Sequence, residues 1–166
     1  MNYLVSYNHS GNTLVRYYIE LLTGLPTIGH NPACISDRFD TNFLNVDKTK
    51  SPILIKRHEV KDKEISINDK FIFLLRNDED CIKSDYDNEI KKYNKLKCQY
   101  LTFKGPRLII FYHEILTDIL GVSKRILQFI EFKETKRTKA IIDTKFHNEK
   151  SLSIYRNPTG QPSCKS

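Results

Sequence analysis

The sequence lacks several features that would place it in common functional classes. None of its four cysteines form a Cys-x-x-Cys pair, so neither a zinc site nor a thiol redox motif is expected. No apolar run approaches the roughly 20 residues that a membrane-spanning helix needs. No signal peptide and no internal repeat are recognisable. The scattered cysteines are therefore expected to be reduced thiols in a soluble, cytoplasmic protein without a membrane span.

The composition that remains is globular and basic. The 166 residues fit one domain, and 39% of them are hydrophobic and 28% charged. Lys and Arg number 27 against 20 Asp and Glu, which gives a net charge of +7. A basic surplus favours anionic partners such as nucleotides, sulfated molecules or nucleic acid. Any single lysine run, such as Lys91-Lys92, is equally compatible with an ordinary solvated surface.

Short apolar segments alternate with helical patterns along the chain. The apolar segments are typical of buried strands and lie at residues 3–7, 52–56, 70–75 and 107–112. Helical spacing is found over residues 13–22 and 123–132, and a further helix is expected to start with Asp78 as its N-cap. This alternation predicts a three-layer α/β fold with a central, mostly parallel sheet and flanking helices.

The remaining segments are polar and have no clear period. Residues 27–51 are interpreted as a long loop with short pieces of structure, and residues 84–104 as helix and loop. Residues 1–134 are predicted to form the nucleotide-binding domain. Residues 135–166 are predicted to be a polar C-terminal segment of the same domain, either a tail or a closing flap.

Polar clusters follow the first three predicted strands. They are His9-Ser10-Gly11, Arg57-His58 and Arg76-Asn77. In parallel sheets, ligands bind beyond the carboxyl ends of the strands. The clusters are therefore expected to meet at one edge of the sheet, although they are far apart in the sequence.

The first of these clusters lies in a turn between a strand and a helix. The N–H groups at a helix N-terminus point outward, and the helix dipole favours an anion there. Gly11 would let the backbone approach a phosphate, while Ser10, Asn12 and Thr13 add short donors. The common phosphate-loop sequence G-x-x-x-x-G-K-[ST] is absent. Taken alone, the turn is also compatible with an ordinary polar connection.

Three further side chains have the chemistry of a phosphate and proton-transfer site. Arg76 is suited to a bidentate grip on a phosphate, and the Ser84 hydroxyl to donating beside it. His58 follows a strand and is a candidate general base. The alternatives are a surface ion pair of Arg76 with Asp78 or Asp80, and a structural role for His58.

Several segments resemble, in order, the motifs of the P-loop sulfotransferases. Residues 6–17 are similar to the family's 5′-phosphosulfate loop, T/S-Y-P-K/R-S-G-T/N-T-W. Residues 55–58 resemble I-K-T-H, and residues 76–84 resemble R-N-P-x-D-x-x-x-S. Residues 111–118 resemble Y-E-D-L-L-T-D, and the helix after that motif has its counterpart at residues 124–130.

The resemblance implies a P-loop nucleotide-hydrolase-like fold and a sulfotransferase. Such an enzyme moves a sulfuryl group from 3′-phosphoadenosine 5′-phosphosulfate to a hydroxyl or amine of a small molecule or glycan, without a metal. The product nucleotide is 3′-phosphoadenosine 5′-phosphate. The catalytic residues implied are His58, as the base, and His9. The nucleotide-binding residues implied are Asn8, His9, Ser10, Gly11, Asn12, Thr13, Leu14, Arg76, Ser84 and Arg156.

The sequence departs from the family pattern at several positions. Asn8 replaces a proline, His9 replaces a lysine or arginine, Leu14 replaces a tryptophan and Asp78 replaces a proline. The family's C-terminal R-K-G-x-x-G loop has only a distant counterpart at residues 155–160, and a helical insertion before the fourth strand is shorter. An unperturbed histidine, with a pKa of about 6.5, is only partly protonated at pH 7. A nearby dianionic phosphate raises such a pKa, so a histidine can still act as the cation.

Two other functions are compatible with the same residues. The first is a non-catalytic nucleotide-binding module of the same fold. The second is a basic nucleic-acid-binding domain, which would explain the net charge of +7. The second offers no reason for the ordered set of Gly11, His58, Arg76 and Ser84, so no nucleic-acid partner is expected.

Overall fold

The computed structural model describes residues 1–29, 35, 45–60, 66, 68–82 and 86–143. The strands of this part are β1 (Asn2–Ser6), β2 (Thr27–Ile28), β3 (Leu54–Arg57), β4 (Lys70–Leu75) and β5 (Arg107–Phe111). Its helices are α1 (Asn12–Thr23), α3 (Asp78–Cys81), α4 (Tyr86–Thr102), α5 (Tyr112–Thr117), α6 (Ile119–Phe129) and α7 (Lys136–Asp143).

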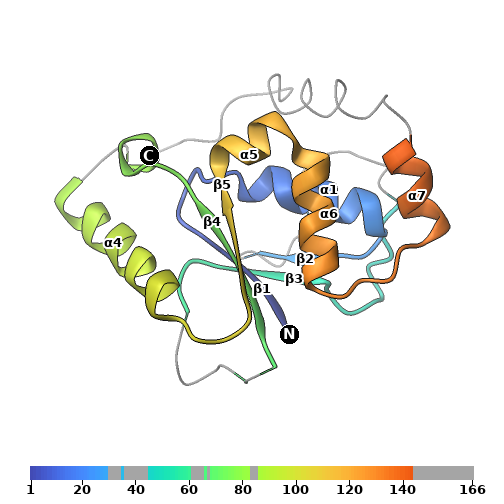
Figure 1. Cartoon of the computed structure of the whole chain (residues 1–166), viewed down its shortest axis with the longest axis horizontal. Helices are drawn as coiled ribbons and strands as arrows, with labels where there is room; N and C mark the ends of the chain where they lie inside the picture. Colours follow the sequence, from blue (N-terminus) through green and yellow to red (C-terminus); the bar gives the residue numbers. More distant parts are fainter. Residues whose placement is uncertain (30–34, 36–44, 61–65, 67, 83–85, 144–166) are drawn as a thin grey trace.

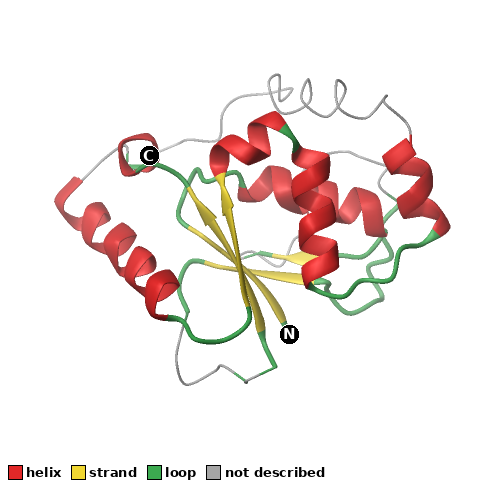
Figure 2. Cartoon of the chain, in the orientation of Figure 1, coloured by secondary structure: helices red, strands yellow, loops and turns green. Residues whose placement is uncertain are grey.

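The five strands form one sheet in the order β2-β3-β1-β4-β5, and every pairing in it is parallel. Figure 1 shows α1, α6 and α7 on one side of this sheet and α4 on the other. Figure 2 shows the same three layers by element type. The predicted α/β fold with a parallel central sheet and flanking helices is therefore confirmed.

The two faces of the sheet are covered by different sets of residues because successive side chains of a strand point to opposite faces. In β1, Leu4 packs in the core under α1 and α6, while Tyr3 and Val5 pack under α4. In β4, Ile72 and Phe73 divide in the same way. All five side chains are buried. Strands that are buried on both faces read as continuous apolar runs, which is why these segments were recognisable in the sequence.

Helix α1 covers the predicted residues 13–22 and extends one residue further at each end. Gly24 has a φ of 68°, and its N–H donates to Glu20 O, so the helix closes with a left-handed residue. The apolar side chains of α1, among them Val15 and Tyr18, are fully buried against the sheet.

The short strand β2 lies at the start of a segment for which no strand was predicted. Glu20 is buried in α1, and its Oε1 accepts bonds from Thr27 N at 3.0 Å and Thr27 Oγ1 at 2.5 Å. Arg16 Nε, also buried, donates to Thr27 Oγ1 at 2.8 Å. These contacts between α1 and Thr27 hold β2 beside β3. The strand was not predicted because nothing in the sequence indicates that Arg16 and Glu20 of α1 bond to Thr27.

The expected strand over 107–112 is one residue shorter, because Tyr112 begins helix α5. The Phe111 N–H donates to Glu114 Oε2 at 2.7 Å, which caps the helix start. Helix α6 begins at Ile119, earlier than the residue 123 expected, because Asp118 Oδ1 accepts from Gly121 N at 2.8 Å. After the end of β4, Asp78 is the first residue of α3, and Asn77 takes the cap position that was expected for Asp78.

Part of the segment expected to be a tail or flap is an ordered helix. Helix α7 packs against α1, where Arg137 Nε donates to Leu21 O at 2.9 Å and Thr138 Oγ1 to Leu22 O at 3.1 Å. Residues 135–143 are therefore joined to the same packed body as the residues before them. Within the described part of the chain, no helix is long and apolar enough to cross a membrane.

Candidate functional site

The three polar clusters that follow β1, β3 and β4 lie together at one edge of the sheet. These strands are neighbours, with β1 in the middle. His58 Nδ1 lies 3.1 Å from Ser6 O, which joins the end of β3 to the end of β1. Arg76 NH1 donates to His9 O at 2.8 Å, which joins the end of β4 to the loop after β1. The convergence predicted from the sequence is thus confirmed.

The strand order reverses at this edge of the sheet, which leaves a crevice there. From β1 the chain runs through α1 to β2 and β3 on one side, and then returns to β4 on the other side. Helices α1 and α4 cover opposite faces of the sheet, as Figure 1 shows. In open parallel sheets, the crevice at such a reversal of strand order is where ligands bind.

The loop between β1 and α1 is a tight turn with two left-handed residues. His9 has a φ of 59° and Gly11 a φ of 83°. A Cβ added to Gly11 would lie 2.9 Å from Ile115 Cδ1 and 3.1 Å from Tyr112 Cδ2. A glycine is therefore needed at position 11 both for the backbone conformation and because α5 packs against the loop.

The start of α1 has the electrostatics of an anion site. The bond from Val15 N to Gly11 O, at 3.0 Å, closes the first turn of the helix. Helix geometry leaves the N–H groups of the three residues before Val15 without an acceptor inside the helix. No side chain caps this end, and its first turn holds no acidic residue. The helix dipole and these N–H groups together favour a bound anion.

The side chains of the loop mostly face inward. Asn12 Nδ2 donates to Ser6 Oγ at 2.7 Å, and both residues are buried. Ser10 is also buried, and Leu14 packs in the core under α1. The side chains of Asn12 and Leu14 are thus buried in the interior, whereas Thr13 is only half-buried.

Arg76 is held between the loop and α5. Its guanidinium carbon lies 4.0 Å from the centre of the Tyr112 ring, and its NH1 donates to His9 O. The carbonyl of Arg76 accepts from Tyr93 OH of α4. Beside it lies a cavity of about 270 Å³. This smaller cavity is lined by residues 75–77, Tyr93, Lys97 and residues 111–113.

Aromatic groups dominate the wall of the smaller cavity on the α5 side. The rings of Phe111 and His113 are stacked, with centroids 5.8 Å apart and planes 15° apart. Phe111 is 46% exposed, although it is large and apolar. Together with Tyr112 and Arg76, these groups give the smaller cavity an aromatic and cationic wall, which suits a planar, anionic molecule.

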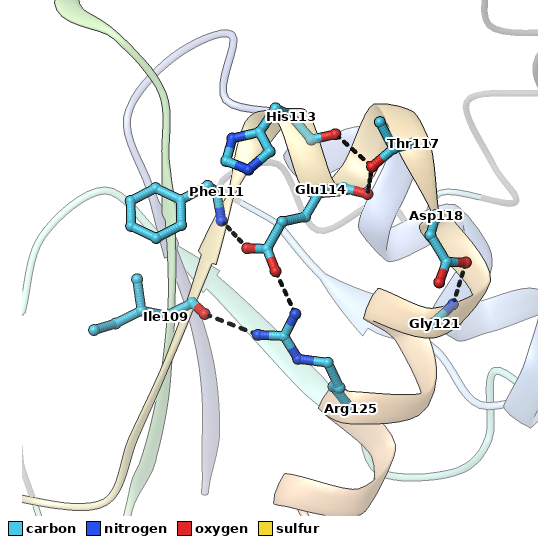
Figure 3. A network of polar contacts seen from close by, with 8 residues as sticks. All are labelled: Ile109, Phe111, His113, Glu114, Thr117, Asp118, Gly121 and Arg125. Atoms are coloured by element: carbon cyan, nitrogen blue, oxygen red, sulfur yellow. Dashed lines mark hydrogen bonds and ion pairs between the residues drawn. The ribbon is translucent and has the colours of Figure 1, made fainter.

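Figure 3 shows how α5 is fixed in place. The Glu114 carboxylate accepts from the Phe111 N–H at 2.7 Å and from Arg125 NH1 of α6. Arg125 NH2 reaches Ile109 O at 3.4 Å. Burial alone would raise the pKa of Glu114, but the bonds from Phe111 and Arg125 outweigh it and lower this pKa. Glu114 and Arg125 thereby position the residues that line the smaller cavity.

His58 lies beside a larger cavity of about 660 Å³. A carbonyl oxygen can only accept, so the contact with Ser6 O places the proton of a neutral His58 ring on Nδ1 and the lone pair on Nε2. The larger cavity is lined by Tyr7, Asn8, Gly29, residues 55–59, and Glu89, Lys92, Lys95, Leu96 and Gln99 of α4.

The α4 residues of the larger cavity were not among the residues predicted for the site. Glu89, Lys92, Lys95 or Leu96, and Gln99 recur at three- and four-residue intervals, which places them on one face of the helix. The spacing was visible in the sequence, but nothing there showed that this face meets the strand ends.

Two of the predicted site residues, Ser84 and Arg156, lie outside the described residues. Among the residues that the structure does describe, no group of three or more His, Cys, Asp and Glu side chains is arranged to hold a metal ion.

Comparison with known proteins gives a fold neighbour. No protein family model and no curated protein sequence matches this chain. Its structure is similar to that of mouse sulfotransferase SULT7A1, crystallised in complex with PAP, with a TM-score of 0.57 and 15% sequence identity. The match covers 99% of this chain and 67% of that chain. The chain therefore has a sulfotransferase-like α/β fold.

Proposed function

We propose that this protein is a sulfotransferase that uses 3′-phosphoadenosine 5′-phosphosulfate and acts on a hydroxyl or amine acceptor. The observation that supports this most is the meeting of three groups at one sheet edge: the open N-terminus of α1, His58 and Arg76. The fold in which they meet is similar to that of a sulfotransferase crystallised with PAP.

The residues present fit a nucleotide with phosphates on two ribose positions. The N–H groups of Asn12, Thr13 and Leu14 and the Thr13 hydroxyl would hold the 5′-phosphate. Arg76 would hold the 3′-phosphate, with Ser84 beside it as the family resemblance implies. The aromatic wall of the smaller cavity would take the base.

His58 would act as the general base. When bound, the nucleotide supplies a sulfuryl group for an in-line displacement, in which positioning and charge stabilisation account for most of the catalysis. His58 Nε2 would take the proton of the acceptor hydroxyl while the oxygen of that hydroxyl bonds to sulfur. The Nδ1 contact with Ser6 O keeps the ring in the tautomer that this step needs.

His9 would stabilise the negative charge that develops on the leaving 5′-phosphate. It lies in the loop whose backbone Arg76 holds, and its side chain is exposed. The bond between sulfur and the phosphate oxygen would break in this step, and a protonated His9 would stabilise the charge left on the phosphate. The helix N–H groups share this task.

One departure from the family supports a second candidate function. His9 stands where the family has a permanent cation, which favours a protein that binds the nucleotide without transferring sulfate. Calorimetry with 3′-phosphoadenosine 5′-phosphate, followed by a transfer assay with labelled donor, separates the two functions. Binding with turnover supports the transferase, binding without turnover supports the non-catalytic module, and absence of binding contradicts both.

A further inference from the structure

The larger cavity beside His58 is lined by both apolar surface and charged side chains. Its volume of about 660 Å³ is within the range of sites for drug-sized molecules. Apolar groups make up more of its exposed lining than polar groups do, and charged side chains of β3 and α4 stand among them. The charged side chains are therefore the feature that could select among acceptors of similar size.

The charged residues of this wall are unequal in number. Four cations, Lys56, Arg57, Lys92 and Lys95, stand against two carboxylates, with His58 counted as neutral. The lining thus carries two more positive than negative charges. A concave wall with an excess of one sign raises the local concentration of molecules of the opposite sign.

The two carboxylates of the cavity are already engaged by neighbouring cations. Glu89 Oε1 accepts from Lys92 Nζ at 2.7 Å, and Glu59 Oε2 accepts from Lys95 Nζ at 3.1 Å. Tyr7 OH also donates to Glu89, and the bonds from Lys92 and then Tyr7 lower the pKa of Glu89. Each carboxylate is thus paired with a lysine of α4, so the two positive charges in excess correspond to Lys56 and Arg57 of β3.

From this wall we infer that the acceptor is a hydroxyl-bearing molecule with a carboxylate or sulfate group near the hydroxyl that reacts. This inference rests on the proposed function for the transfer itself. The anionic group lies against the cationic wall from β3 and α4, and this contact places the neighbouring hydroxyl at His58. Lys92 and Lys95 have side chains that are 68% and 65% exposed, so they can turn toward a bound anion.

A matched pair of glycosides tests the inference. p-Nitrophenyl β-D-glucuronide and p-nitrophenyl β-D-glucoside differ only in a carboxylate or a hydroxymethyl group at one carbon. Their affinities for the full chain are measured by calorimetry, with and without 3′-phosphoadenosine 5′-phosphate. The glucuronide is expected to bind about tenfold more tightly, because charge-assisted contacts are stronger than neutral ones. This preference should decrease as the salt concentration is raised.

Two double variants assign the preference to the cavity. Lys92→Gln/Lys95→Gln removes two charges from the wall, and Lys91→Gln/Lys124→Gln removes two exposed charges outside it. The first pair is expected to bring the two affinities within about twofold of each other, and the second to keep the full preference. Both pairs change the net charge equally, so long-range attraction cancels from the comparison.

Equal binding of the two glycosides, or a full preference in the Lys92→Gln/Lys95→Gln variant, would overturn the inference. The proposed function has a separate readout. If the bisphosphate nucleotide fails to bind, the transferase proposal fails, while the glycoside affinities measured without nucleotide still decide the charge preference. If sulfate is transferred equally well to both glycosides, the transferase stands and the acidic acceptor does not.

Discussion

At the scale of single residues, the proposed function depends on two histidines. The contact of His58 with Ser6 O leaves Nε2 as the basic nitrogen, and the position of His9 in the loop puts an ionisable ring where the family has a permanent cation. In the proposed mechanism these two histidines have opposite requirements, because His58 would have to be neutral and His9 protonated for the same step.

Replacing His58 by alanine is expected to abolish sulfate transfer while leaving nucleotide affinity nearly intact. The base is lost, but the N–H groups of α1 and Arg76 remain. Transfer rates and calorimetry with 3′-phosphoadenosine 5′-phosphate measure the two effects separately. The lost bond to Ser6 O should cost about 1 kcal/mol of unfolding free energy. Full activity in this variant would remove His58 from the mechanism.

The protonation of His9 predicts a particular pH dependence. Raising the pH above neutrality removes the proton from His9, so the transfer rate should decline there. The variant His9→Lys keeps its charge and should hold its rate to higher pH. Rates measured from about pH 6 to 9 on both proteins test this, and a flat profile for the unmodified protein contradicts it.

Gly11 and Gly24 both have a left-handed backbone conformation, so the effects of replacing each by alanine on stability can be compared. Gly11→Ala is expected to cost about 2–3 kcal/mol of unfolding free energy, since the added Cβ meets Ile115 Cδ1 and the φ is positive. Gly24→Ala is the control, because its φ is also positive but its nearest neighbour is the flexible end of Arg137 at 3.3 Å. Urea unfolding of both variants measures the difference, and equal losses would contradict the packing argument.

At the scale of elements, α5 decides the shape of the smaller cavity. Glu114 caps this helix and bonds Arg125 of α6, so one carboxylate fixes two helices at the end of β5 (Figure 3). The sequence showed Glu114 within a segment similar to a family motif. It did not show that Tyr112 begins a helix, because the apolar run suggested a longer strand.

The lowered pKa of Glu114 predicts an acid-sensitive contribution to stability. A carboxyl group with a depressed pKa in the folded state stabilises the fold above its unfolded pKa, and this contribution is lost as the pH falls through the folded value. Glu114→Gln should therefore cost about 1 kcal/mol at pH 6 and less at pH 3. Glu134→Gln, which removes an exposed carboxylate, is the control. Urea unfolding at both pH values gives the comparison, and an equal cost at both contradicts the assignment.

At the scale of the whole molecule, α7 joins the C-terminal side of the described chain to the end of α1. Thr138 is fully buried and donates to Leu22 O, while burial lowers the pKa of Arg137, which bonds Leu21 O. Because most residues of α7 are polar, the sequence shows little apolar periodicity there, and no helix was predicted. Their bonds to distant carbonyls account for its position.

Thr138→Val is expected to lower the unfolding free energy by about 1–2 kcal/mol, because the buried Leu22 carbonyl loses its donor while the volume is kept. Thr102→Val is the matched control, since the Thr102 hydroxyl is exposed and bonds within its own helix. Urea midpoints of the two variants should differ clearly. Similar values would show that α7 adds little to the body of the protein.

The sequence by itself determined the layers of the fold and the sheet edge at which the polar clusters meet. Buried strands such as β4 and the amphipathic helix α1 follow from local apolar patterns, and parallel strands place His58 and Arg76 at one edge. These predictions succeeded because they depend on periodicity and on the rule for strand ends, both of which are written locally in the chain.

Only the tertiary structure decided which side chains complete the crevice. Asn12 bonds Ser6 in the interior, and Gly11 is required by a helix about a hundred residues later. Lys92 and Lys95 line the same cavity as His58 because of the placement of α4. These contacts join residues far apart in the chain. They depend on how the helices pack on the sheet, and single-sequence patterns carry no record of that packing.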